Sequence, residues 1–207
     1  MSTFERRCLW ALPAGGIITL IAFLPWVSDI GHPAAQYDPP AFARLITSPV
    51  GSVTFYGYLV GALCVIFGVL GLYLYLSSTA AHNWAAAGMI LGVTGTVSLI
   101  AMAFALLSAS VVADFYVSGH EDAAALLGNF EGGSAVSARL ISLVLVTLVV
   151  GLTGGVAMAV AIWRSGRLPK WVGIPLVAAF VLPVSGPIGM AVLIFAGAWI
   201  AYKAYNA

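Results

Sequence analysis

The chain has 207 residues, of which 62% are apolar and only 7% charged, against about 25% charged residues in an ordinary soluble domain. This composition excludes a soluble globular domain, a disordered tail and a nucleic-acid-binding protein. It predicts an all-α integral membrane helical bundle, a single transmembrane domain over residues 1–207 with membrane lipid around it and no nucleic-acid partner.

Apolar runs predict six membrane segments, at residues 9–27, 53–76, 84–113, 137–163, 171–182 and 186–203. The last apolar run, residues 171–202, would be roughly 48 Å long as one helix, which exceeds a hydrocarbon core of about 30 Å. It contains Pro183, Ser185, Gly186 and Pro187, and such residues break or turn a helix. We therefore expect a hairpin there, with a fifth segment of about 12 residues, or roughly 18 Å, that is too short for a full span. The alternative is five segments with a long, kinked last helix.

Basic residues near the segment ends favour the hairpin. With the N-terminus inside, the hairpin places six Lys and Arg residues in the cytoplasm and leaves two outside, whereas the kinked helix places five inside and three outside. Cytoplasmic loops carry the excess of Lys and Arg, so we expect both termini to be cytoplasmic in a cell (inner) membrane. The six residues are Arg6, Arg7, Arg164, Arg167, Lys170 and Lys203. The same topology gathers tryptophans and tyrosines in an inner aromatic belt, namely Trp10, Trp84, Trp163, Trp171, Trp199, Tyr202 and Tyr205.

Two longer outer loops, residues 28–52 and 114–136, contain short helical patterns and most of the acids. Pro39 and Pro40 before residues 41–46 predict one helix that lies on the membrane. Residues 118–122 predict the start of a second over residues 123–130. These loops also carry the best candidate metal ligands, a mixed set of histidines and carboxylates, or else a solvated acidic surface with a helix cap. The set is His32, Asp38, His120, Glu121 and Asp122.

Pairs of glycines four residues apart lie in three of the predicted spans. This spacing puts small residues on one helix face, where another helix backbone can approach closely. We expect these glycines to pack helices together, either within the chain or against a partner subunit or a second copy. They are Gly57 and Gly61, Gly88 and Gly92, and Gly151 and Gly155.

Chemistry-bearing residues are scarce inside the spans. No Asp, Glu, Lys, Arg or His lies at mid-depth, which argues against an ion-coupled transporter with a membrane carboxylate and against a retinal protein. Hydroxyls such as those of Thr94, Thr96 and Thr153 are expected to bond carbonyls of their own helix. No catalytic residue and no cofactor are predicted. Ser185 and Gly186, in the broken segment with Pro183 and Pro187, are the candidate ligand or hinge positions.

One stretch resembles a known type of protein. Residues 161–173, reading AIWRSGRLPKWVG, resemble the R-S-G-x-L-P-R-W-x-G inner loop of small bacterial multi-pass membrane proteins of unknown function, with Lys170 in place of the more usual arginine. Residues 71–76 and 115–119 are similar to other parts of such proteins. The resemblance implies about six helices, a bacterial cell membrane and no assigned reaction.

These observations favour a non-enzymatic membrane protein, an accessory or structural subunit or a small homo-oligomer that acts through helix packing. A carrier or binder of a neutral, lipid-like molecule is the alternative, because the broken final segment lies beside spans that carry hydroxyls. A metal-dependent membrane enzyme or sensor that uses the outer histidines and acids is the second alternative.

Overall fold

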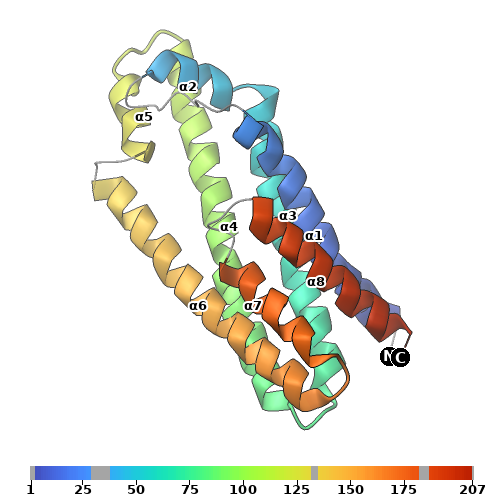
Figure 1. The fold of residues 1–207 in the computed structure, drawn as a ribbon. Coiled ribbons are helices and arrows are strands. Elements are labelled where there is room, and N and C mark those ends of the chain that lie inside the picture. Colours follow the sequence, from blue (N-terminus) through green and yellow to red (C-terminus); the bar gives the residue numbers. More distant parts are fainter. Residues whose placement is uncertain (1–2, 29–37, 132–134, 182–186, 207) are drawn as a thin grey trace.

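A computed structural model describes residues 3–28, 38–131, 135–181 and 187–206, and all regular structure in these ranges is helical. The long helices lie side by side (Figure 1). They are α1 (Thr3–Ser28), α2 (Pro39–Ile46), α3 (Pro49–Ser77), α4 (His82–Val117), α5 (Ala123–Glu131), α6 (Ala135–Ser165), the 3-10 turn η1 (Lys170–Val172), α7 (Gly173–Val181) and α8 (Pro187–Tyr205).

The long helices form one elongated bundle, which confirms the predicted all-helical class. α1 packs along α3 on one side and α8 on the other, while α4 packs on α3 and α6. Among the described residues, four helices are long and apolar enough to cross a membrane: Thr3–Leu24, Pro49–Ser77, Leu148–Ser165 and Ile188–Tyr205. The 36-residue α4 would rise about 54 Å, so it extends well past a hydrocarbon core of about 30 Å.

The two short helices expected in the outer loops are present as α2 and α5. Both lie at the end of the bundle where α4 finishes (Figure 1), and both contact α4. Phe42, Ala43 and Ile46 of α2 are buried against Ala109 and Ala113 of α4, together with Leu127 of α5. We call this region the α2/α5 end.

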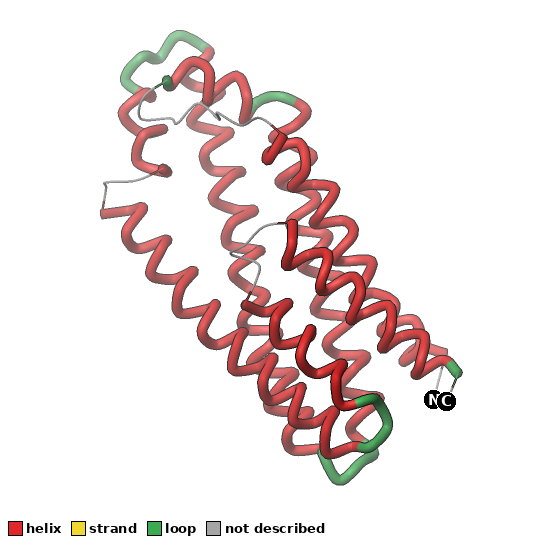
Figure 2. The backbone as a smooth tube through the Cα atoms, in the orientation of Figure 1, coloured by secondary structure: helices red, strands yellow, loops and turns green. Residues whose placement is uncertain are grey.

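α7 and α8 form a hairpin rather than one long helix. α7 begins at the opposite end of the bundle and stops part of the way along it, and α8 starts near that level and returns to the same end (Figure 2). The chain ends marked N and C lie side by side there (Figure 1). Pro187 is the first residue of α8, whereas Pro183, Ser185 and Gly186 lie outside the described residues. The break expected between residues 182 and 186 therefore separates two helices that run in opposite directions.

Most of the buried core lies toward the end that carries the N- and C-termini. Leu9 and Leu12 of α1, Leu72 and Leu76 of α3, Ile162 of α6, Leu176 of α7 and Ile200 of α8 are all less than 2% exposed and form one cluster. This cluster holds α7 and α8 against the long helices. It thereby positions the charged and aromatic side chains that surround the same end.

Candidate functional site

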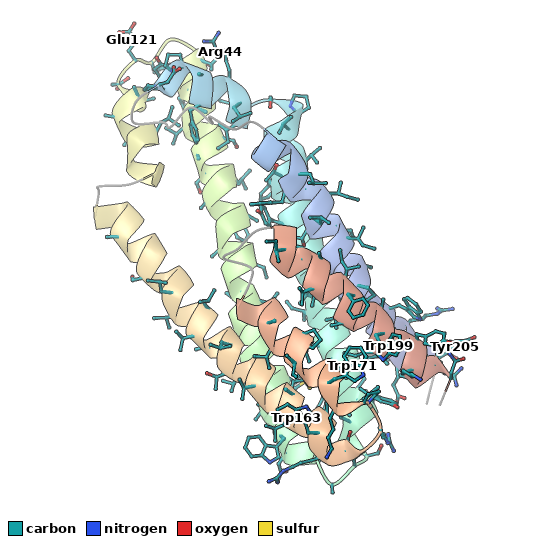
Figure 3. All side chains as sticks on the ribbon, in the orientation of Figure 1. Arg44, Glu121, Trp163, Trp171, Trp199 and Tyr205 are labelled. Atoms are coloured by element: carbon teal, nitrogen blue, oxygen red, sulfur yellow. The ribbon has the colours of Figure 1, made fainter. Side chains whose placement is uncertain are left out.

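The end that carries both termini is basic and aromatic, and we call it the basic end. Figure 3 shows Trp163, Trp171, Trp199 and Tyr205 gathered there, far from Arg44 and Glu121 at the α2/α5 end. In the described ranges four cations lie over aromatic rings there, three of them over a ring from another part of the chain and one over a ring of its own helix, and such a pair is worth about 0.5–2 kcal/mol. The pairs are Arg6 over Tyr205 at 5.0 Å, Arg164 over Trp84 at 5.5 Å, Arg167 over Tyr75 at 5.4 Å and Lys203 over Trp199 at 5.6 Å from the ring centroid.

The turn between α6 and η1 is closed by its own side chains. The indole N–H of Trp163 donates a hydrogen bond to the backbone oxygen of Lys170, and Arg167 donates one of 2.7 Å to the backbone oxygen of Tyr75 in α3. Gly166 has a φ of +66°, a left-handed conformation that favours glycine. The residues that carry the sequence resemblance thus form a compact turn tied to a neighbouring helix.

One contiguous aromatic surface runs along α8 at the basic end. Phe195, Trp199 and Tyr202 share a face of the helix, since they are spaced by four and three residues. Trp171, which precedes α7, lies 6.2 Å from Phe195 and 5.4 Å from Trp199, and Trp199 lies 6.4 Å from Tyr202, measured between ring centroids. Lys203 completes this group over the ring of Trp199. We call these five residues the α8 aromatic surface.

The indole nitrogen of Trp199 is a polar atom without a partner. It is buried, and the part of the chain that the structure describes offers it no hydrogen-bond acceptor. A buried donor left unpaired costs about 1–3 kcal/mol. The α8 aromatic surface therefore combines an apolar platform, a positive charge and an unused N–H donor.

The four candidate metal ligands that the structure describes, Asp38, His120, Glu121 and Asp122, lie at the α2/α5 end. Asp38 caps α2, because its carboxylate accepts a 3.2 Å hydrogen bond from the backbone N–H of Ala41. Over the described ranges no three His, Cys, Asp or Glu side chains lie close enough to share a metal ion. His32 lies outside these ranges, so the full predicted set is not visible. Asp38 acts as a helix cap, and His120, Glu121 and Asp122 are exposed. This arrangement agrees with the alternative interpretation, a solvated acidic surface with a helix cap.

His120 occupies the turn between α4 and α5. Its Nδ1 lies 3.2 Å from the backbone oxygen of Phe115 and must donate to it, because a carbonyl only accepts, and its ring packs edge-to-face on Phe115 at 5.8 Å. His120 and Asp122 border a shallow cavity of about 190 Å³ whose other walls are apolar, formed by Val112, Phe115, Ala123 and Leu126. Glu121 and Asp122 are exposed. The cavity is smaller than the roughly 300–1,000 Å³ typical of ligand pockets.

The glycines of α3 lie directly against α1. A Cβ atom at Gly57 would overlap Ala22, and one at Gly61 would overlap the Thr19 hydroxyl, while a Cβ at Gly68 would come within 2.6 Å of the Cβ of Leu12. Thr54 of α3 adds a hydrogen bond across this interface, since its hydroxyl lies 3.1 Å from the backbone oxygen of Ala22 and 2.9 Å from that of Val50. The Gly57 and Gly61 pair therefore packs two helices of the same chain.

The second glycine interface joins α4 to α6. A Cβ at Gly88 would come within 2.8 Å of the backbone nitrogen of Met158, and one at Gly154 would overlap the backbone nitrogen of Gly92. Gly151 and Gly155 are buried, but the residue seen against Gly92 is Gly154, which the sequence analysis missed. It also missed Gly68 and Gly71 of α3, although their spacings of 7 and 10 residues from Gly61 place them on the same face.

Most hydroxyls within the spans bond their own helices, as expected. Thr94, Thr96 and Thr153 donate to the backbone oxygens four residues earlier at 2.8–2.9 Å. These polar groups are satisfied locally. The candidate ligand or hinge residues Pro183, Ser185 and Gly186 cannot be placed beside them, because they lie outside the described residues.

Charge is strongly divided between the two ends of the bundle. Arg164, Arg167, Lys170 and Lys203 lie at the basic end with Arg6, Arg7 and the acid Glu5. Asp38, Asp114, Glu121 and Asp122 lie at the α2/α5 end with the basic residue Arg44. Such an arrangement is suited to binding an anionic surface at one end. No protein-family model, curated protein or solved structure matches the chain, so its function has to be argued from this geometry.

Proposed function

We propose that the chain is a non-enzymatic integral membrane protein, an accessory or structural subunit that acts through its lipid-exposed helix faces. The observation behind this proposal is that the glycines pack against helices of the same chain. The glycine faces of α3, α4 and α6 are already filled by α1, α4 and α6 of the same chain. Contacts with another polypeptide would therefore be made by the large apolar side chains that remain exposed.

These exposed faces are extensive. On α3, the face opposite the glycines carries Val53, Tyr56, Val60, Leu63 and Phe67, which are 44–61% exposed. Further exposed side chains lie on α4 and α6, among them Phe104 at 55% and Val149 at 60%. Helices in a bilayer associate by van der Waals packing rather than by the hydrophobic effect, so a partner is recognised here by shape.

We place six membrane segments in a bacterial inner membrane, with the α7 and α8 hairpin entering from the basic end and that end in the cytoplasm. The divided charge supports this orientation, because Lys and Arg are retained on the cytoplasmic side. Cysteine labelling tests it: in a chain with Cys8 and Cys64 replaced, a membrane-impermeant maleimide should label S118C from outside the cell. S78C, in the turn between α3 and α4, should react only after permeabilisation. The reverse pattern would overturn the orientation.

Photo-crosslinking in the native host tests the subunit proposal. A photoreactive residue would replace Val60 on α3, Phe104 on α4 or Val149 on α6, one at a time, with the 5%-exposed Val65 as the background control. We expect at least one exposed position to give an adduct with another polypeptide, and the adduct mass separates a foreign subunit from a second copy. Adducts with lipid alone at every exposed position would refute the proposal.

A further inference from the structure

We infer that the α8 aromatic surface is a binding site for an anionic phospholipid, with the lipid phosphate at Lys203 and a lipid ester carbonyl at the indole N–H of Trp199. The inference relies on the basic end lying at the level of the lipid headgroups, as proposed above. It does not depend on whether the chain has a polypeptide partner.

The apolar part of the site matches an acyl chain. Phe195, Trp199 and Tyr202 form a stripe along one face of α8, and Trp171 widens it from the start of α7. Phe195 and Tyr202 are 57% and 56% exposed, and Trp171 is 43% exposed. The neighbouring rings are tilted against one another by 35–54°, so they offer an uneven apolar surface on which a flexible chain of methylene groups can lie.

The polar part of the site follows the order of groups in a phospholipid. Trp199 and Lys203 lie one helical turn apart, about 6 Å along α8. This separation is comparable to the headgroup layer of one leaflet, about 5–7 Å deep. Lys203 lies nearer the end of the helix, and its ammonium, 5.6 Å from the centre of the Trp199 ring, would meet the phosphate of a lipid whose ester carbonyl lies at the indole.

The unused donor supports the same assignment. The indole nitrogen of Trp199 is buried with no acceptor among the described residues, while the side chain as a whole is only partly buried. For a lipid ester carbonyl to accept from this buried N–H, the indole would have to rotate toward the surface when the lipid binds, and we include this rotation in the inference. The hydrogen bond would recover the cost of leaving the donor unpaired.

The charge selects an anionic headgroup rather than a choline. Quaternary ammonium groups are recognised by aromatic faces, but the ammonium of Lys203 lies over the ring of Trp199 and repels a second cation there. The basic end has Arg6, Arg7, Arg164, Arg167 and Lys170 in addition, against Glu5 as the one acid in its described helices and turns. A headgroup with net negative charge is therefore favoured over a zwitterionic one.

The test is native mass spectrometry of the full chain in mild detergent, titrated with phosphatidylglycerol or phosphatidylcholine. We expect tighter retention of phosphatidylglycerol, weakened about tenfold by Lys203→Gln because a charge-assisted hydrogen bond is lost. Lys203→Arg should retain it. Trp199→Phe keeps an aromatic ring but lacks the N–H, and should weaken binding several-fold.

Helices α6 and α4 provide matched controls at the same end. Arg164 over Trp84 is a second cation–π pair at that end, so Arg164→Gln and Trp84→Phe remove the same charge and the same N–H elsewhere. If these variants lose as much lipid as the α8 variants, binding depends only on general charge and the site is refuted. Equal retention of the two lipids, or displacement of the lipid by millimolar inorganic phosphate, would also refute it. If cysteine labelling confirms the orientation but mass spectrometry shows no preference for phosphatidylglycerol, the lipid site is refuted and the proposed orientation is not.

Discussion

Arg167 donates a 2.7 Å hydrogen bond to the backbone oxygen of Tyr75, a residue 92 positions earlier in the chain, and its guanidinium also lies 5.4 Å from the centre of the Tyr75 ring. One side chain thus ties the turn after α6 to the end of α3. The planar guanidinium can make both contacts at once, which a lysine ammonium cannot do in the same way.

We therefore expect Arg167→Gln to lower the free energy of unfolding by about 1–2 kcal/mol, and Arg167→Lys to recover only part of the loss. The measurement is the midpoint of denaturant unfolding in detergent, followed by circular dichroism. Lys170→Gln is the control, because the contact seen for Lys170 uses its backbone oxygen. Equal effects of Arg167→Gln and Lys170→Gln would show that charge alone matters.

Gly68 lies against Leu12 with no room for a side chain. Gly68→Leu should therefore force α1 away from α3 and destabilise the bundle by about 1–3 kcal/mol, the usual cost of overpacking. The neighbouring residue Phe67 is 50% exposed, and Phe67→Leu should change stability little. Thermal unfolding of both variants in the same detergent checks this, and a stable Gly68→Leu protein would show that the helices do not pack this closely.

Comparing variants of Thr54 and Thr94 distinguishes the contribution of an interhelical hydrogen bond from that of a hydrogen bond within one helix. The Thr54 hydroxyl bridges the backbone oxygens of Ala22 and Val50, whereas the Thr94 hydroxyl bonds only Ile90 of its own helix. Thr54→Val should cost about 0.6 kcal/mol, a typical value for hydrogen bonds between membrane helices. Thr94→Val should cost less. The prediction fails if the order of the two unfolding midpoints is reversed.

Gly166 adopts a φ of +66°, and no atom lies within 4 Å of where its Cβ would be. A side chain there meets no steric contact, so any loss of stability comes from the backbone conformation. Gly166→Ala should cost about 1–2 kcal/mol, and Gly166→Asn less, because asparagine tolerates this conformation better. Comparing the two variants by unfolding isolates the backbone effect, and equal stabilities would contradict it.

Local signals predicted much of the fold. Pro39 and Pro40 predicted α2, although the role of Asp38 as its cap was not assigned, and the residues from Pro183 to Pro187 predicted that residues 171–202 do not form one helix. These features act within a few residues of sequence.

Which helices pack against one another was harder to predict from the sequence. Spacing shows that glycines share a face, but it does not show which helix covers that face, so Gly154 was missed beside Gly151 and Gly155. The contact of Arg167 with Tyr75 joins residues too far apart for any periodic pattern to reveal. The aromatic residues of α8 were expected in an interfacial belt, whereas their grouping with Trp171 depends on the return of α8 alongside α7.

The packing of α1 against α8 has a consequence for synthesis. A Cβ at Gly16 of α1 would come within 2.8 Å of Ile194, and one at Gly197 of α8 within 2.9 Å of Pro13. The two helices are therefore in direct contact, although they are far apart in the sequence. During translation α1 and α3 emerge early and can pair at once, but the side of α1 that faces α8 stays open until α8 has left the ribosome. Until then Pro13 and Gly16 are not covered by α8, so this face of α1 is available to the insertion machinery.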